Sequence, residues 1–166
     1  STGGGVWISS GFGSSTSSGA VLFESSSTTG AAGVSGMISF STGVASDGSS
    51  GTLWVGSGSS SNGKGGDVNL NAGSGDDGVG GDIILISGES TGDEGGSVAI
   101  RSGYGSATSS GGLDLITSNA GGAGVSGAIS FASGTTSSGN SGSLNLMTGE
   151  ASNGVGGNIA LRVGSG

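Results

Sequence analysis

Residues 80–88 read Gly-Gly-Asp-Ile-Ile-Leu-Ile-Ser-Gly, and they contain the pattern that governs the whole chain. The second glycine, Gly81, is followed by apolar residues at the second and fourth positions, Ile83 and Leu85. Apolar residues at every second position are typical of a β-strand that has one covered face. The stretch therefore predicts a short strand that begins beside Gly81 and ends at Gly88.

The same unit occurs eleven times, at intervals of 15 residues except for one interval of 17 and one of 16. The anchor glycines are Gly4, Gly19, Gly36, Gly51, Gly66, Gly81, Gly96, Gly111, Gly127, Gly142 and Gly157. The second and fourth residues after every anchor are apolar, and we call them the paired apolar residues. They are Val6/Ile8, Val21/Phe23, Ile38/Phe40, Leu53/Val55, Val68/Leu70, Ile83/Leu85, Val98/Ile100, Leu113/Leu115, Ile129/Phe131, Leu144/Leu146 and Ile159/Leu161.

A repeat of fixed period indicates a solenoid, in which each unit packs only on its neighbours. Pairs such as Asp47-Gly48 and Asn62-Gly63 recur between the apolar segments and predict short returns. The sequence thus predicts an all-β fold, a parallel β-solenoid (β-helix or β-roll) of eleven coils of about 15 residues. An antiparallel meander with one strand per repeat is the alternative. The solenoid is favoured because the pattern repeats identically in every unit.

A longer repeat of about 91 to 92 residues, or six coils, is superimposed on the short one. Residues 10–19 match residues 102–111 at nearly every position. Coils 1 to 5 therefore correspond to coils 7 to 11, and coil 6, which begins at Gly81, has no counterpart. Because no atypical capping repeat is visible, we expect residues 1–166 to form a single solenoid segment of a longer tandem array.

The composition excludes several classes of function. The chain has 43 glycines but no proline, cysteine or histidine, so disulfides, thiolate metal sites and Ser-His-Asp catalysis are absent. Eleven acidic and only three basic residues give a net charge of −8, which argues against nucleic acid and anionic membranes as partners. No apolar run approaches the roughly 18 residues of a membrane span, so membrane insertion is not expected. We also expect no enzymatic activity.

Acidic residues are concentrated between positions 67 and 94. Asp67 and Asp82 directly follow their anchors, so stacked coils would bring like charges together, and a cation between them would relieve the repulsion. Carboxylates on flexible turns suit Ca²⁺. The candidate calcium ligands are Asp67, Asp76, Asp77, Asp82, Asp93 and Glu94. A solvated acidic patch without metal is favoured over this site, and no other cofactor is expected.

Two resemblances extend these interpretations. The segments 65–68 and 80–83 (Gly-Gly-Asp followed by Val or Ile) resemble the glycine-rich repeat of calcium-binding toxin β-rolls, but they lack its internal Gly-x-Asp spacing. The motif of residues 80–88 resembles that of Gly/Ser-rich tandem-repeat β-solenoid proteins of algal surfaces and of viral and phage fibres. This second resemblance covers the whole chain, and it implies a structural role outside the cell or on a cell or virion surface.

We therefore expect a structural repeat protein that forms an extracellular fibre, sheath or adhesive stalk. The expected partners are other copies of the chain, associated end to end or laterally, with outward residues such as Trp7 and Trp54 in lateral contact. Exposed Ser and Thr residues are candidate acceptors of O-glycans. Two alternatives are an ice-binding β-solenoid, although the outward columns form no regular Thr ladder, and a calcium-dependent adhesin segment.

Overall fold

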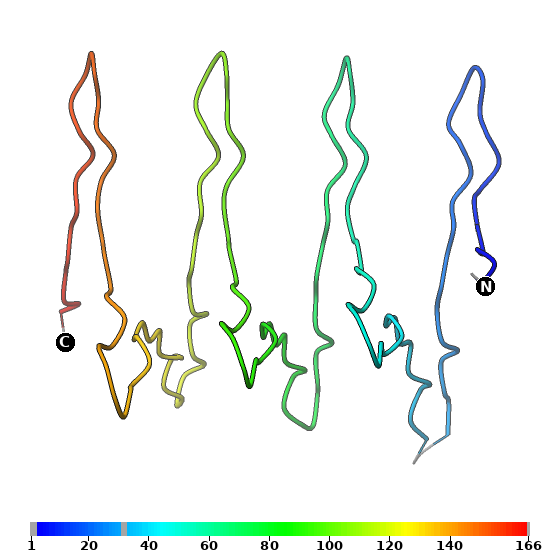
Figure 1. The fold of residues 1–166 in the computed structure, drawn as a ribbon, viewed down its shortest axis with the longest axis horizontal. Helices are drawn as coiled ribbons and strands as arrows, with labels where there is room; N and C mark the ends of the chain where they lie inside the picture. The colour runs from blue at the N-terminus through cyan, green and yellow to red at the C-terminus, as the bar shows by residue number, and fades with distance from the viewer. Residues whose placement is uncertain (1–2, 31–32, 166) are drawn as a thin grey trace. The chain divides into compact units, whose positions relative to one another are not determined.

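The computed structural model describes residues 3–30 and 33–165. Over these residues the chain has no helix and no β-strand, and it consists of extended segments joined by bends and turns (Figure 1). The predicted all-β fold, a parallel β-solenoid of eleven coils, is therefore wrong. The ends of the expected single segment 1–166 lie outside the described residues.

The backbone hydrogen bonds show why no solenoid forms. A solenoid needs rows of bonds between successive coils, yet in residues 3–30 and 33–165 every backbone bond closes a single return. Five of these bonds join an anchor N–H to the carbonyl oxygen eight residues earlier, at N···O distances of 2.9–3.2 Å. They are Gly19 to Gly11, Gly66 to Gly58, Gly81 to Gly73, Gly96 to Gly88 and Gly111 to Gly103. Each return therefore closes on itself instead of leading the chain onto the previous coil.

The returns are narrow where they close, and we call this place the neck. A methyl group on an anchor glycine would lie 3.0–3.6 Å from the side chain of a small residue at the end of the preceding apolar segment. The neck pairs are Ser10–Gly19, Ser25–Gly36, Thr42–Gly51, Ser57–Gly66, Ala72–Gly81, Ser87–Gly96, Ser102–Gly111, Thr117–Gly127, Ser133–Gly142 and Thr148–Gly157. The recurring anchor is glycine, and its partner is small, because the two backbones approach closely there.

The apolar pattern has a structural counterpart in the exposure of the side chains. From Val21 to Ile159, the paired apolar residues are 47–72% exposed, whereas the other large apolar side chains in that range are 72–100% exposed. One face of each segment is thus partly covered. Among the described residues, however, none is buried, so the chain on its own builds no hydrophobic core.

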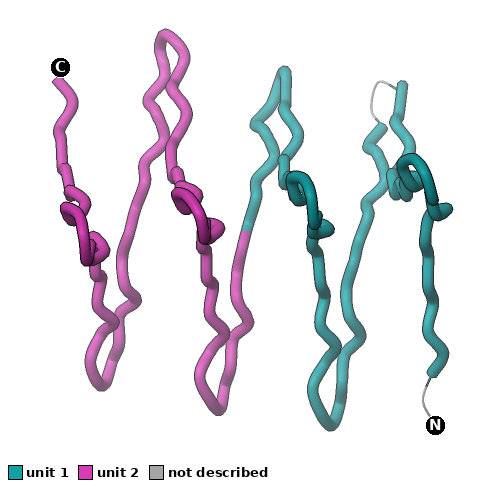
Figure 2. Tube along the Cα trace, turned by 90° about the horizontal axis from the view of Figure 1, so that it is seen from above, with its two compact units in different colours: residues 1–84 teal, residues 85–166 magenta. Residues whose placement is uncertain are grey.

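The chain divides into two units, Ser1–Ile84 and Leu85–Gly166, and the division falls within coil 6 (Figure 2). Some residues related by the six-coil repeat have similar local geometry in the two units. Gly48 and its equivalent Gly139 have φ values of 146° and 119°, and they are the positive-φ residues of the described chain. Likewise, the Gly33 N–H donates to the Gly30 carbonyl oxygen at 3.2 Å, and the equivalent Gly124 N–H donates to the Gly121 carbonyl oxygen at 3.1 Å.

Candidate functional site

An open apolar groove lies in the first unit. It has a volume of about 900 Å³ and is lined by side chains from three successive repeats. The lining residues are Val21, Phe23, Phe40, Leu53, Trp54, Val55 and Gly56, and we call this surface the aromatic groove. Its volume lies within the range of about 300–1,000 Å³ that is usual for binding pockets. Most of its side chains are paired apolar residues, so the sequence repeat itself supplies the lining.

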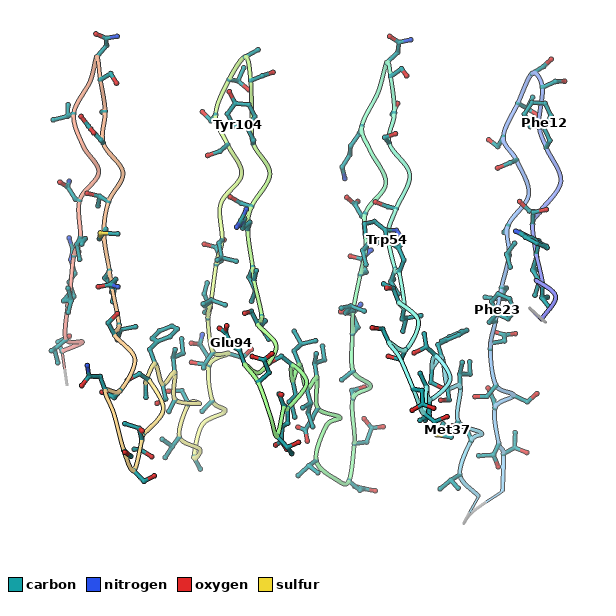
Figure 3. The ribbon with its side chains drawn as sticks, in the orientation of Figure 1. Phe12, Phe23, Met37, Trp54, Glu94 and Tyr104 are labelled. Carbon is teal, nitrogen blue, oxygen red and sulfur yellow. The ribbon has the colours of Figure 1, made fainter. Side chains whose placement is uncertain are left out.

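Two aromatic contacts shape the groove. The rings of Phe23 and Phe40 meet edge to face, with centroids 6.3 Å apart and an interplanar angle of 83°. Such a pair contributes about 0.5–1.5 kcal/mol beyond the burial of its surface. The Trp54 indole lies over Gly56, because a methyl group on that glycine would be 2.9 Å from the indole Nε1. Trp54 is nevertheless 87% exposed, and Figure 3 shows Phe23 and Trp54 on separate segments of the chain.

The backbone around the groove carries free hydrogen-bonding groups. Among the described residues, no backbone–backbone bond uses an N–H or C=O group between residues 34 and 57. The nearest backbone bonds flank this stretch, at Gly30 to Gly33 on one side and at Gly58 to Gly66 on the other. The groove therefore combines apolar side chains with extended backbone that is not paired to its own chain.

The candidate calcium ligands are exposed and are divided between the units. Asp67, Asp76, Asp77 and Asp82 lie in the first unit, and Asp93 and Glu94 lie in the second. Asp67 Oδ2 forms an ion pair with Lys64 Nζ at 2.7 Å. The Asp93 N–H donates to Ser90 Oγ at 2.9 Å, and the Glu94 N–H donates to Asp93 Oδ1 at 2.9 Å.

These interactions link neighbours within single returns. The described part of the chain brings no three carboxylates into a group that could hold a metal ion. Calcium binding at these positions stays a prediction, as does the solvated acidic patch.

The sequence pattern puts Phe23, Phe40, Leu53 and Val55 on the apolar side of their segments, but it does not predict that they line one groove. It assigned Trp54 to the outward side, which agrees with its high exposure, but not to a groove. The available signal is the clustering of aromatic residues in coils 2 to 4, which contain three of the chain's six phenylalanines and tryptophans. The periodic pattern describes only what all eleven repeats share, so it does not reveal a concentration of aromatic residues in three of them.

No helix in the described residues is long and apolar enough to cross a membrane. Comparison with protein-family models, with curated proteins and with solved structures finds no match to this chain.

Proposed function

We propose that the chain is a structural repeat segment of an extracellular fibre, sheath or adhesive stalk, and that it is built into this structure by association with other copies of itself. The observation that carries the proposal is the absence of any buried residue among those described, in a chain whose paired apolar residues nevertheless share one face. A regular apolar face that the chain covers only in part is most simply buried by other chains.

The amount of exposed surface supports this proposal. The accessible surface is 16188 Å² for a chain of 15.1 kDa. A compact monomer of this mass would expose about 7,100 Å². The surplus of about 9,000 Å² is more than five times the roughly 1,600 Å² that a standard protein–protein interface buries. Such a surplus favours an extended assembly over a complex with one small partner.

The composition supports an extracellular structural role. Ser and Gly keep the surface hydrated and uncharged over most of its length, and only 14 of the 166 residues carry a charge. Exposed hydroxyl groups are also sites for O-glycans, which would add to this hydration. The proposal requires no catalytic residue, no cofactor and no partner other than the chain itself and attached glycans.

Electron microscopy of the purified chain over a concentration series, with sedimentation velocity in parallel, tests the proposal. The expected result is filaments or sheets above a threshold concentration. Monodisperse single chains at every concentration would contradict it. An inhibition of ice recrystallisation by such single chains would then support the ice-binding alternative, and assembly that appears only with added Ca²⁺ would support the adhesin.

A further inference from the structure

The aromatic groove differs from the rest of the apolar face in what it offers a partner. It gathers side chains from coils 2, 3 and 4 around one space, with the edge-to-face pair of Phe23 and Phe40 within it. Aromatic residues dominate the energetics of protein interfaces, since they bury large areas at little cost in conformational entropy. The groove is therefore the place on the described surface where an incoming apolar segment would gain most.

The unpaired backbone beside the groove defines the shape of the occupant. Extended backbone without partners is a template for another extended chain, which adds hydrogen bonds while its alternate side chains fill the adjacent pockets. Residues 51–57, which follow the return at residues 46–48 and carry four of the seven lining residues, meet this description. The occupant is accordingly an extended segment with apolar residues at every second position.

The chain itself contains such segments. Each of the eleven repeats places two apolar side chains on one face of an extended segment, with glycine or small residues at both ends. Small end residues allow two backbones to approach closely. A second copy of the chain therefore supplies eleven such segments. Each copy carries both the groove and the segments that could occupy it.

Charge is compatible with this occupant. All lining residues of the groove are uncharged, and between residues 20 and 57 the chain carries only Glu24 and Asp47. Two copies of net charge −8 repel each other over long distances, but salt screens this repulsion. Association of copies through the groove should therefore strengthen as the salt concentration rises.

We propose that the aromatic groove is the docking site for an extended apolar segment of a second copy of the chain, which pairs its backbone with residues 51–57. This inference rests on the proposed function, because it names the surface through which copies associate. It differs from that proposal in locating the contact in coils 2 to 4 of one unit.

The experiment uses the full chain carrying Trp7→Phe, which leaves Trp54 as the only tryptophan. Trp54 emission, sedimentation and amide hydrogen exchange are followed against concentration. The series is run at about 0.01 M and about 0.15 M salt, where the screening length falls from about 30 Å to about 8 Å. We expect association that is stronger at the higher salt, an emission shift to shorter wavelength on association, and slower amide exchange within residues 51–57.

Two matched double variants, made in the chain that keeps Trp7 and compared by sedimentation, locate the contact. Phe23→Leu with Trp54→Asn should raise the concentration of half-association at least about tenfold, because it removes two of the three aromatic side chains that line the groove. Phe12→Leu with Trp7→Asn removes the same side-chain types at exposed positions outside the groove, and it should change that concentration less than about twofold. Amide exchange of Gly66, whose N–H bonds Gly58, reports whether the neighbouring return stays closed in every variant.

Failure of the docking site and failure of the proposed function give different results. If the two double variants weaken association equally, or if Trp54 keeps its solvent-exposed emission in the assembly, the groove is not the docking site, although copies still associate. Emission that is already shifted in dilute single chains would also overturn the inference, because the chain itself would then cover the groove. If no association occurs at any concentration, the proposed function fails together with the inference.

Discussion

Coils 2 to 4 of the first unit and coils 8 to 10 of the second present the same exposure pattern with different side chains. Ile38 and its equivalent Ile129 are 47% and 49% exposed, and Phe40 and Phe131 are 64% and 63% exposed. Apart from two exchanges of valine for leucine, at Val21 and Val55, the residues that line the aromatic groove differ between the units in three pairs. These are Phe23 against Leu115, Trp54 against Asn145, and Gly56 against Met147. The repeat thus determines how far each position is covered, whereas a few substitutions determine what the covered face can bind.

The largest expected effect comes from giving the second unit the aromatic residues of the first. Leu115→Phe, Asn145→Trp and Met147→Gly would recreate the aromatic anchors and the glycine beneath the indole. A second groove should lower the concentration of half-association by about tenfold or more, as expected for an added hot spot. Sedimentation velocity measures this change. Val125→Phe with Asn140→Trp adds the same aromatic types within returns and should have much less effect.

A smaller effect, equal in the two units, is expected from the turn glycines Gly13 and Gly105. A methyl group on Gly13 would lie 2.6 Å from the Ser17 carbonyl oxygen, and one on Gly105 would meet the Ser109 carbonyl oxygen. Alanine at either position should open its return and break the neck hydrogen bond. The closed return should lose about 1 kcal/mol of stability, so the anchor amide should exchange about fivefold faster.

Amide exchange of Gly19 and Gly111 reports the two returns separately, because these N–H groups make the neck bonds. Gly112→Ala serves as the control, since a methyl group there meets no atom within 4 Å. A large effect in one unit and none in the other would show that equivalent returns do not have equivalent stability.

Gly56→Met places the residue of the second unit beneath Trp54. Because its Cβ would be 2.9 Å from the indole Nε1, the ring has to move, and association should weaken by about threefold, or about 0.6 kcal/mol. Time-resolved fluorescence anisotropy of Trp54 in the Trp7→Phe chain measures the displacement. The reciprocal change, Met147→Gly, should leave Trp54 unaffected. An unchanged anisotropy with Gly56→Met would contradict the position of the Trp54 indole over Gly56.

The smallest effect is expected from the ion pair of Lys64 and Asp67, whose equivalents in the second unit are Val155 and Asn158. Lys64→Val with Asp67→Asn should speed amide exchange of Gly66 by about twofold, because exposed ion pairs contribute only about 0.2–1 kcal/mol. The difference should vanish at about 1 M salt, where the screening length is about 3 Å. A difference that persisted at high salt would indicate that the pair acts through packing instead of charge.

Part of the architecture could be predicted from the sequence. The positions of the returns, the special role of the anchor glycines and the side of each segment that is better covered all follow from local pattern. Asp47-Gly48, for example, was identified as a turn, and Gly48 has a positive φ. Such features depend on residues close together in the sequence, and the residue types restrict them directly.

The relation between successive repeats could not be predicted in the same way. A 15-residue period is equally compatible with coils that stack and with segments that turn back at each return. The deciding contact is the approach of each anchor to the segment before it, as at Ser57 and Gly66, where the Ser57 hydroxyl also donates to the Gly66 carbonyl oxygen at 2.7 Å. The groove was missed for a related reason, because the convergence of coils 2, 3 and 4 depends on how the returns orient consecutive segments.

The necks also have a mechanical consequence. Each of the five bonded returns is closed by a single backbone bond across eight residues, with no buried core behind it. Eight residues span up to about 27 Å when fully extended, so a return that opens under tension releases on the order of 20 Å of slack. The returns would open one after another at low force and close again when the load is removed. Under tension, such a chain would lengthen in small, reversible steps, one for each return that opens.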